Sequence, residues 1–301
     1  IQGGMGAERA VSLVTGKGFA AALTELGYPF EVIDAGPDLQ TQLSNVKADV
    51  ALLALHGKYA EDGIVQGICE YMKLPYSGSG VLASALCMDK ILTKQVLLNA
   101  KIPTAKHVLA DTKKTKVADI PVPDLGWPLV VKPSREGSSV GVSIVKDQSG
   151  FRKAIETAAK YDHMILMEQY IAGMELTVPI LQGQPLTPIE IVPKLDFYTY
   201  ENKYTAGATD YILPARASAK TIELAKKYAV AAFDVLRLRT YGRIDFRVDT
   251  EGNPFVMEMN TLPGCTPTSL FPKSARHDGI EFNQLIEILV ETAGLDYEGL
   301  A

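Results

Sequence analysis

The chain has 301 residues, of which 47% are hydrophobic and 22% are charged, and its formal net charge is −5. This length and composition predict a folded chain of about two or three domains. The negative charge argues against a general nucleic-acid binder, and no apolar run is long enough for a membrane span. Three scattered cysteines favour a reducing cytoplasm over a disulfide framework.

The N-terminal part alternates strands and helices. A glycine turn at residues 3–6 follows a short stretch typical of a strand end, so we expect the first strand to be cut short. Apolar spacing predicts helices over Glu8–Leu26 and Gly63–Met72, and strands over Phe30–Asp34 and Asp49–Leu55. This order predicts a parallel α/β domain whose functional edge lies at the strand C-termini.

Two polar side chains of this part are candidate site residues. Glu8 lies in the first turn of its helix, where it either stabilises the positive helix end or serves a site. His56 directly follows an apolar strand, and histidines there are more often structural than catalytic. The residues alone leave both alternatives open.

The middle of the chain contains a candidate phosphate-binding loop. A helix is expected over Val81–Asn99, and a strand over Trp127–Pro133 includes Lys132 near its end. Residues 134–141 are rich in glycine and serine and lead into a second strand, Val142–Val145. Such a loop can lay backbone N–H groups over phosphates, or it is a plain flexible hairpin. It matches neither a Walker A motif nor a dinucleotide fingerprint.

Beyond this loop, the strand Met164–Ile171 is expected to end near an adenine pocket. The segment Asp196–Pro214 has four tyrosines and no sustained period, which suits a lid loop or a solvated excursion. Helices are expected over Ala219–Arg237 and Phe282–Ala293. Pro267–Leu270 is typical of a helix start, where free N–H groups can bind a carboxylate.

A β-hairpin is predicted over residues 244–260. Polar and apolar residues alternate over Ile244–Asp249 and again over Phe255–Asn260, and Thr250–Asn253 has turn composition. If this four-residue turn closes the hairpin, Asp249 lies opposite Pro254.

The same register creates a candidate metal site. It places Asp245 opposite Glu258 and Arg243 opposite Asn260 on one face, with Met257 among the apolar side chains on the other. Two carboxylates and an amide oxygen suit a hard cation, first of all Mg²⁺. The alternative is a solvated hairpin face whose charges happen to alternate.

Several motifs then form an ordered set along essentially the whole chain. They are Gly3-Gly4 with Glu8–Leu13, Leu55-His56-Gly57 with Glu61-Asp62-Gly63, Gly78-Ser79-Gly80 with Met88-Asp89-Lys90, Val131–Gly141, Lys203-Tyr204, Gly242–Asp245, and Glu258–Thr261 with Pro263-Gly264. The set resembles the D-alanine–D-alanine ligases of the ATP-grasp superfamily. The chain departs from the family pattern at Gly6, where a serine is common, and at Tyr59-Ala60, which replace a more glycine-like pair.

The resemblance implies a three-domain α/β fold of the ATP-grasp class. Residues 1–87 would form an N-terminal α/β substrate domain, residues 88–172 the central ATP-grasp subdomain, and residues 173–301 the C-terminal metal and catalytic domain. ATP would lie between two antiparallel sheets, one from each of the last two domains.

The resemblance also implies a set of site residues, carried over position by position. The catalytic group would be Glu8, Ser138, Tyr204, Arg243 and Gly264, with Glu8 at the ammonium of the first D-alanine, linked through Ser138 to Tyr204, and with Arg243 and the Gly264 N–H as oxyanion hole. The other substrate residues would be His56, Ser269 and Leu270. ATP would be bound by Lys90, Lys132, Glu168, Ile171, Glu175 and Lys203. Two Mg²⁺ (or Mn²⁺) ions would be held by Asp245, Glu258 and Asn260.

The implied function is ATP-dependent ligation of two D-alanines through a D-alanyl phosphate, releasing ADP and phosphate, for peptidoglycan synthesis and hence cell-wall biogenesis and cell shape. A cytoplasmic homodimer without nucleic-acid or membrane partners would fit the family. Alternatives are a D-alanine–D-lactate or D-alanine–D-serine ligase, or another ATP-grasp carboxylate–amine ligase. A non-catalytic nucleotide-binding protein would require a broken metal set.

Overall fold

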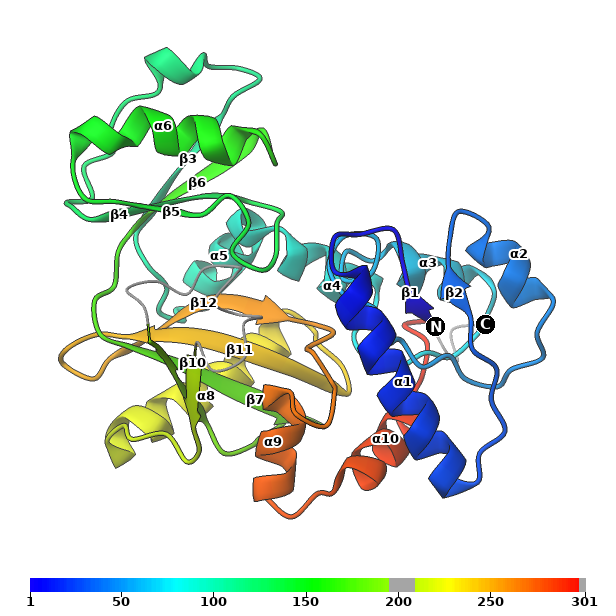
Figure 1. Cartoon of the computed structure of the whole chain (residues 1–301). Coiled ribbons are helices and arrows are strands. Elements are labelled where there is room, and N and C mark those ends of the chain that lie inside the picture. Colours follow the sequence, from blue (N-terminus) through cyan, green and yellow to red (C-terminus); the bar gives the residue numbers. More distant parts are fainter. Residues whose placement is uncertain (195–208, 298–301) are drawn as a thin grey trace.

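The structure, a computed structural model, describes residues 1–194 and 209–297. Figure 1 shows three regions: a central lobe at the upper left, a large sheet below it, and the N-terminal region to the right. The elements of the N-terminal region are β1 (Gln2–Gly3), α1 (Arg9–Leu26), β2 (Asp34–Ala35), α2 (Leu39–Ser44), α3 (Ile64–Tyr71) and α4 (Val81–Met88).

The N-terminal region has less regular strand structure than the sequence predicts. β1 and β2 pair in parallel, as expected, but each has only two residues. The run predicted as a strand over Asp49–Leu55 contributes one isolated bridge, between Ala51 and Tyr76. Ala51 and residues 53–55 of this run are still buried. The run lies beside the first residue, since Ile1 N donates to the Leu52 carbonyl at 2.7 Å and the Ala54 N–H donates to the Ile1 carbonyl at 2.9 Å.

The single helix predicted over Val81–Asn99 is divided into α4 and α5 (Lys90–Asn99). Asp89 between them has an extended backbone, and its carboxylate accepts hydrogen bonds from the N–H groups of Ile91 and Leu92 at 3.0 and 3.2 Å. An aspartate that caps a new helix in this way ends the previous one. The apolar spacing continues across the break at Asp89. The sequence pattern therefore gave no sign that the helix is divided.

The central lobe is a four-stranded antiparallel sheet in the order β3-β6-β4-β5. Helix α6 covers one face of it, and Phe151 and Ile155 of that helix are fully buried there. The elements after α5 are β3 (His107–Asp111), η1 (Val117–Asp119), β4 (Leu129–Pro133), β5 (Ser143–Val145), α6 (Gln148–Ala159) and β6 (Met164–Gln169).

The third region is an antiparallel sheet in the order β10-β9-β7-β11-β12, with β8 paired to β7. Helix α8 packs on one face, against Ile244 and Phe246. The elements are β7 (Met174–Leu181), β8 (Gln184–Pro185), β9 (Ile189–Pro193), β10 (Thr209–Ile212), α8 (Ala219–Val235), β11 (Tyr241–Val248), β12 (Pro254–Asn260), α9 (Leu270–His277) and α10 (Phe282–Glu291).

Buried apolar side chains form three clusters, of which one lies within the central lobe and two join regions. One cluster joins the N-terminal region to the end of the chain, because Phe271 of α9 and Leu285 of α10 pack with Phe19 and its neighbours. Another places Leu97 of α5 beneath the large sheet with α8. The predicted domain boundaries near residues 87 and 172 stay a prediction. The last two helices, α9 and α10, share a core with the N-terminal region.

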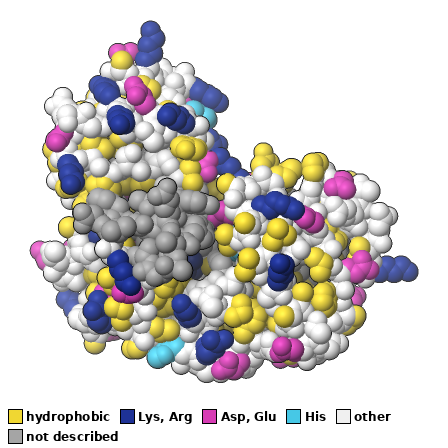
Figure 2. Space-filling model, in the orientation of Figure 1, with side chains coloured by type: hydrophobic (Ala, Val, Ile, Leu, Met, Phe, Trp, Pro, Cys, Tyr) yellow, Lys and Arg dark blue, Asp and Glu magenta, His cyan; other side chains and the backbone are white. Residues whose placement is uncertain are grey.

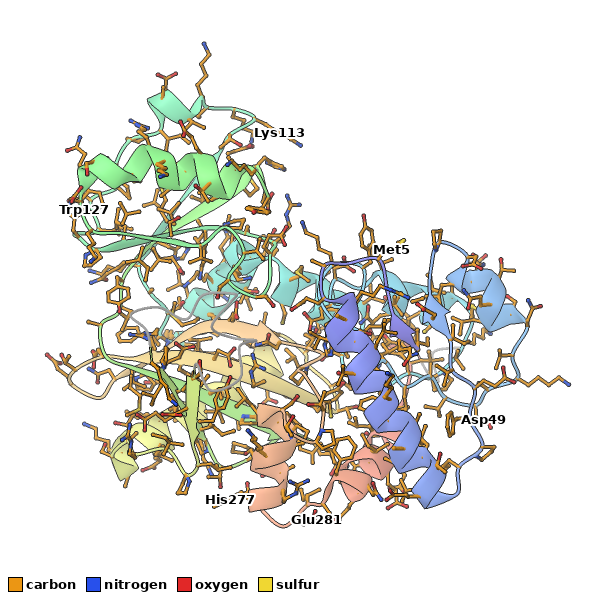
Figure 3. All side chains as sticks on the ribbon, viewed as in Figure 1. Met5, Asp49, Lys113, Trp127, His277 and Glu281 are labelled. Carbon is orange, nitrogen blue, oxygen red and sulfur yellow. The ribbon has the colours of Figure 1, made fainter. Side chains whose placement is uncertain are left out.

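Charged side chains of both signs are interspersed over the face shown in Figure 2. Figure 3 shows that Lys113 and Trp127 lie on the central lobe, while His277 and Glu281 lie at the turn between α9 and α10. Within residues 1–194 and 209–297, no helix is long and apolar enough to cross a membrane.

We predict that Asp89→Ala lowers the free energy of unfolding by about 1 to 2 kcal/mol, because it removes the cap of α5. Asp38→Ala is the matched control, since Asp38 precedes α2 without a side-chain capping bond, and it should cost less than about 0.5 kcal/mol. Urea-induced unfolding measures both. Equal losses in the two variants would contradict the role of Asp89.

Candidate active site

A cavity of about 1040 Å³ lies between the central sheet and the large sheet. Its walls come from β4 and the following loop on one side, and from β7, β11 and β12 on the other. A cleft of this size suits a ligand as large as a nucleotide. The predicted ATP residues Lys90, Lys132, Ile171 and Glu175 line it, together with the predicted metal ligands Asp245 and Glu258.

Glu168 was also expected at this cavity, facing adenine, but the structure places its carboxylate behind the wall. The side chain is fully buried, and its two oxygens lie 2.5 Å from the ammonium nitrogens of Lys94 and Lys132. Burial alone would raise the pKa of Glu168, yet the two lysines hold it well below its ordinary value. Glu168 therefore contacts a residue of the cavity wall, Lys132, without lining the cavity itself.

The hairpin of β11 and β12 carries the predicted metal ligands in the predicted register. Arg243 pairs with Asn260, and Asp245 pairs with Glu258. Beyond that point the register shifts by one residue, and Val248, not Asp249, lies opposite Pro254.

The shift is a β-bulge at Met257, which has no partner on β11. Val256 and Met259 are both buried, so Met257 and Glu258 between them cannot alternate strictly, and both line the larger cavity. The expectation that Met257 packs behind the sheet was wrong. The bulge turns an apolar side chain into the cavity wall directly beside a carboxylate.

Cations and donors surround the carboxylates of this face. The Arg243 guanidinium donates to both oxygens of Asp245, at 2.8 and 2.9 Å. Asp245 also accepts from the Asn260 amide at 3.0 Å and from the Thr177 hydroxyl at 2.6 Å. Lys90 Nζ lies 3.4 Å from Glu258 Oε2. These contacts argue against the alternative of a solvated hairpin face, because they hold the side chains in one arrangement.

Within the described residues, no three or more His, Cys, Asp or Glu side chains are grouped to hold a metal ion. Asp245, Glu258 and Asn260 offer two carboxylates and one amide, which is a partial ligand set. Mg²⁺ keeps several waters and is commonly bound by one or two carboxylates together with substrate phosphates. The three side chains therefore fit a hard cation that is shared with a phosphate-bearing ligand.

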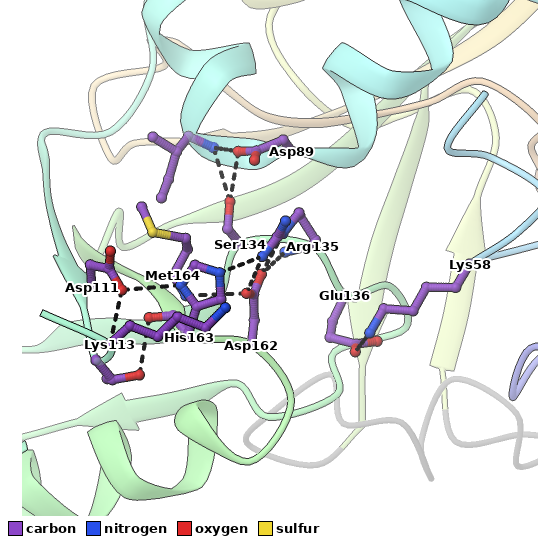
Figure 4. Close-up of polar contacts among 12 residues, drawn as sticks. Lys58, Asp89, Asp111, Lys113, Ser134, Arg135, Glu136, Asp162, His163 and Met164 are labelled. Atoms are coloured by element: carbon purple, nitrogen blue, oxygen red, sulfur yellow. Dashed lines mark hydrogen bonds and ion pairs between the residues drawn. The ribbon is translucent and has the colours of Figure 1, made fainter. Parts of the chain in front are cut away.

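The glycine/serine loop at residues 134–141 is anchored where it leaves β4 (Figure 4). The Ser134 hydroxyl donates to the Asp89 carboxylate at 2.8 Å, which ties the loop to the start of α5. Arg135 forms a two-pronged ion pair with Asp162, at 2.6 and 2.9 Å. A plain flexible hairpin would not need these buried partners.

The rest of the loop is held over the cavities. Lys58 of the N-terminal region pairs with Glu136 (Figure 4), and Lys90 Nζ donates to the Glu136 carbonyl at 2.6 Å. Ser138 and Ser139 both have left-handed backbones, with φ of 50° and 59°. This conformation is strained for serine, and strain of this kind persists where surrounding contacts hold it, often at functional sites.

A second cavity of about 550 Å³ adjoins the first on the side of the N-terminal region. The predicted substrate and catalytic residues line it, namely Glu8, His56, Ser138, Arg243, Gly264, Ser269 and Leu270. Lys90, Arg243 and Glu258 line both cavities. The two spaces therefore meet at a group of charged side chains.

The Glu8 carboxylate is one of the acidic groups that line the smaller cavity. It accepts a hydrogen bond from the Ser138 hydroxyl, although 130 residues separate the two in sequence. Gly57 passes so close that a Cβ atom there would lie 2.6 Å from Glu8 Oε2, and its φ of 73° is one that glycine tolerates. These contacts fix the Glu8 carboxylate at the wall of the cavity; its role at a substrate stays a prediction.

His56 is a buried wall of the same cavity. Its Nε2 lies 2.9 Å from the Thr15 hydroxyl, and its Nδ1 lies 3.1 Å from the Leu262 carbonyl. Burial lowers the pKa of the imidazole, so the neutral form dominates near neutral pH. Two fixed partners and a low pKa indicate a residue that shapes the cavity.

The start of α9 also lines the smaller cavity. Ser269 precedes the helix, and its hydroxyl accepts from the Thr266 N–H at 3.1 Å. Leu270 begins the helix, whose first backbone N–H groups have no partner within the helix itself. Glu8 therefore offers this cavity a negative charge that suits a cation, and the helix start offers backbone N–H groups that suit an anion.

Comparison with protein families now adds to this geometry. The family model described as the D-ala D-ala ligase C-terminus matches residues 97–291, and the one described as the D-ala D-ala ligase N-terminus matches residues 31–79. The chain belongs to the D-alanine–D-alanine ligase family.

Individual members of the family are similar along nearly the whole chain. The D-alanine–D-alanine ligase of Syntrophotalea carbinolica is 44% identical over 98% of this chain and 95% of its own, and that of Geotalea uraniireducens is 45% identical over 98% and 94%. A crystal structure of the Bacillus anthracis ligase complexed with ATP superposes with a TM-score of 0.84 at 36% identity, covering 97% of this chain and 94% of that one. The ATP-grasp fold expected from the motifs is thereby confirmed.

Two predicted site residues cannot be placed. Lys203 and Tyr204 lie outside the described residues, so their assignments stay predictions. The described part of the segment predicted as a lid is β10, which pairs with β9 at the edge of the large sheet.

Glu61 also belongs to the smaller cavity, although it was not among the predicted site residues. It lines the cavity, and burial raises the pKa of its carboxyl to about 8, with the nearby Glu8 adding to the rise. Only its place in the motif after His56-Gly57 could have drawn attention to it. Its environment is made by residues distant in sequence, among them Arg243 and Glu258.

We predict that Glu61→Gln becomes more stable relative to the parent chain as pH rises. The folded chain holds the Glu61 proton up to about pH 8, whereas the unfolded chain releases it near the ordinary glutamate pKa of 4.5. The parent therefore loses stability between these pH values, and the variant gains at least about 1 kcal/mol on it, the value of one pKa unit.

Urea unfolding with EDTA at about pH 5 and about pH 8 measures this difference. Glu223→Gln, at an exposed position of α8, is the control and should show no such trend. A stability difference that is the same at both pH values would refute the buried-carboxyl interpretation.

Proposed function

We propose that this chain joins two D-alanines into D-alanyl-D-alanine, using ATP and releasing ADP and phosphate, with a D-alanyl phosphate as intermediate. One observation carries the proposal: a nucleotide-sized cavity and a smaller cavity meet at Lys90, Arg243 and Glu258. The family relationship and the ATP complex of the Bacillus anthracis enzyme support the same conclusion.

ATP occupies the larger cavity in this proposal. Lys90 and Lys132 contact phosphate oxygens, with Lys203 adding charge, while Ile171 faces adenine and Glu175 binds the ribose. Glu168 acts through its ion pair with Lys132. Asp245, Glu258 and Asn260 hold two Mg²⁺ or Mn²⁺ ions, which when bound neutralise charge on the phosphate oxygens.

The first D-alanine occupies the smaller cavity. Glu8, held by Ser138 and linked to Tyr204, binds its ammonium group, and His56 forms a wall beside it. The carboxylate then points towards the boundary shared by the two cavities. There a carboxylate oxygen attacks the γ-phosphorus, the bond from that phosphorus to the bridging oxygen breaks, and ADP leaves a D-alanyl phosphate.

The second D-alanine completes the reaction. Its carboxylate binds at the start of α9, at Ser269 and Leu270, and its amine attacks the carbonyl carbon of the acyl phosphate. Arg243 and the Gly264 N–H stabilise the oxyanion that forms; removal of one such donor typically costs about 3 kcal/mol. The carbon–oxygen bond to phosphate then breaks, and the peptide bond remains. Because water would hydrolyse the acyl phosphate, a buried site is required.

The product serves peptidoglycan synthesis in this proposal. Use of ATP and three free thiols, all buried, suit the cytoplasm. A homodimer is the proposed assembly, by family relationship alone. D-lactate and D-serine as second substrates are outcomes of the test below.

The direct test is mass analysis of the products from Mg·ATP with D-alanine alone, with D-alanine plus D-serine, and with D-alanine plus D-lactate. We expect D-alanyl-D-alanine and phosphate from D-alanine alone. Product formed only when D-serine or D-lactate is present would show that this compound, and not D-alanine, is the second substrate. No product from any mixture would overturn the proposed activity.

We also predict that Ser138→Ala raises the KM for the first D-alanine by about tenfold, the value of one hydrogen bond to a charged group, and leaves the KM for ATP unchanged. Ser149→Ala is the matched control, since the Ser149 hydroxyl also donates to a carboxylate, that of Asp147, on the surface. Steady-state kinetics measures both constants. A parallel rise in both KM values would argue against a specific role for Ser138 at Glu8.

A further inference from the structure

Lys94 is a lysine with a buried ammonium group that no step above uses. It lies on α5, and its side chain is 1% exposed. It lines neither of the two cavities described above. A buried ammonium group is costly unless it is paired, so its partners indicate what it does.

The first partner is Glu168 of β6. Lys94 Nζ lies 2.5 Å from Glu168 Oε1, and Lys132 Nζ lies 2.5 Å from Glu168 Oε2. One fully buried carboxylate is thus shared by two ammonium groups, of which only Lys132 lines the larger cavity. When both lysines are charged, the cluster carries one excess positive charge, and an anion at the cavity side of Lys132 would balance it.

The second partner is Thr104, just ahead of β3. Lys94 Nζ donates to its hydroxyl at 2.5 Å, and that hydroxyl donates to the Val256 carbonyl of β12 at 2.7 Å. The Val256 N–H donates to the Pro103 carbonyl at 2.8 Å. Val256 immediately precedes the bulge that turns Met257 and Glu258 into the larger cavity.

These contacts form one buried polar chain between the two sheets that enclose the larger cavity. It runs from Lys132 on β4 through Glu168 and Lys94 to Thr104 and Val256 on β12. Lys94 links the two parts of this chain, because it contacts Glu168 of the central sheet and also Thr104, which is bonded to the large sheet. Loss of its ammonium group would leave Glu168 opposed by Lys132 alone.

We propose that Lys94 is a positioning residue for ATP: by sharing Glu168 it leaves the Lys132 ammonium group available to phosphate, and through Thr104 it fixes Lys132 relative to Glu258. This inference rests on the proposed function, in which Lys132 contacts a phosphate of ATP. Without Lys94, Lys132 and Glu168 form a neutral pair, and the excess positive charge that would attract a phosphate is lost. None of the five residues of this chain lines the smaller cavity.

Lys94→Met tests this, because methionine keeps most of the volume and removes the charge. We expect the Kd for Mg·ATP, measured by calorimetry without D-alanine, to rise at least about tenfold, as for loss of a hydrogen bond to a charged group. The KM for D-alanine at saturating ATP should stay unchanged. A purely structural role would move both constants or neither, and either result would overturn the proposal.

Thr93→Val is the matched control. Thr93 is 1% exposed on the same helix, and its hydroxyl donates to the Leu86 carbonyl at 2.6 Å without touching Glu168. It should lower the Tm and leave the Kd for Mg·ATP unchanged. A loss of ATP affinity equal to that of Lys94→Met would show that any defect in α5 has this effect, and would overturn the proposal.

If Lys94→Met does not fold, Thr104→Val tests the positioning role of Lys94 instead. It keeps both ion pairs of Glu168 and removes only the hydroxyl between Lys94 and Val256, so the Kd for Mg·ATP should rise by about threefold, as for one ordinary hydrogen bond. An unchanged Kd would overturn the proposal. Because these tests compare ATP binding between variants, their failure is distinct from failure of the parent chain to form the dipeptide.

Discussion

The pairing of β11 with β12 is the constraint on which the rest of the site depends. Because Asp245 lies opposite Glu258 on one face, two carboxylates are held side by side where their mutual repulsion must be offset. Arg243 and Lys90 offset it in the structure. The same face can therefore accept cations and the phosphates that accompany them. The loop after β4 and the start of α9 line the same cavities as these charged side chains.

Much of this hairpin was predictable, because strand alternation alone determines which side chains share a face. Arg243 opposite Asn260 and Asp245 opposite Glu258 follow from it. The bulge at Met257 does not, since an extra residue leaves the sequence pattern almost unchanged while it shifts every pair beyond it. The break at Asp89 is a similar case: apolar spacing continues across it, and only the capping carboxylate marks a new helix.

The arrangement of the site from distant segments is a different matter. Glu8 and Ser138 are 130 residues apart, and no local pattern predicts that they share a hydrogen bond. The family motifs place both in the site, so the resemblance supplied what local reasoning could not. It was less informative about side chains behind the site. Glu168 was predicted to face adenine, and no local pattern indicated that its carboxylate would lie between the ammonium groups of Lys94 and Lys132.

The central claim is that ATP and the first D-alanine meet at the boundary of the two cavities and form an acyl phosphate there. The most direct measurement uses D-alanine with both carboxylate oxygens replaced by ¹⁸O, followed by mass analysis of the released phosphate. We expect one ¹⁸O atom in each phosphate, transferred when the carboxylate attacks the γ-phosphorus. Phosphate without ¹⁸O, or label appearing in AMP, would contradict it.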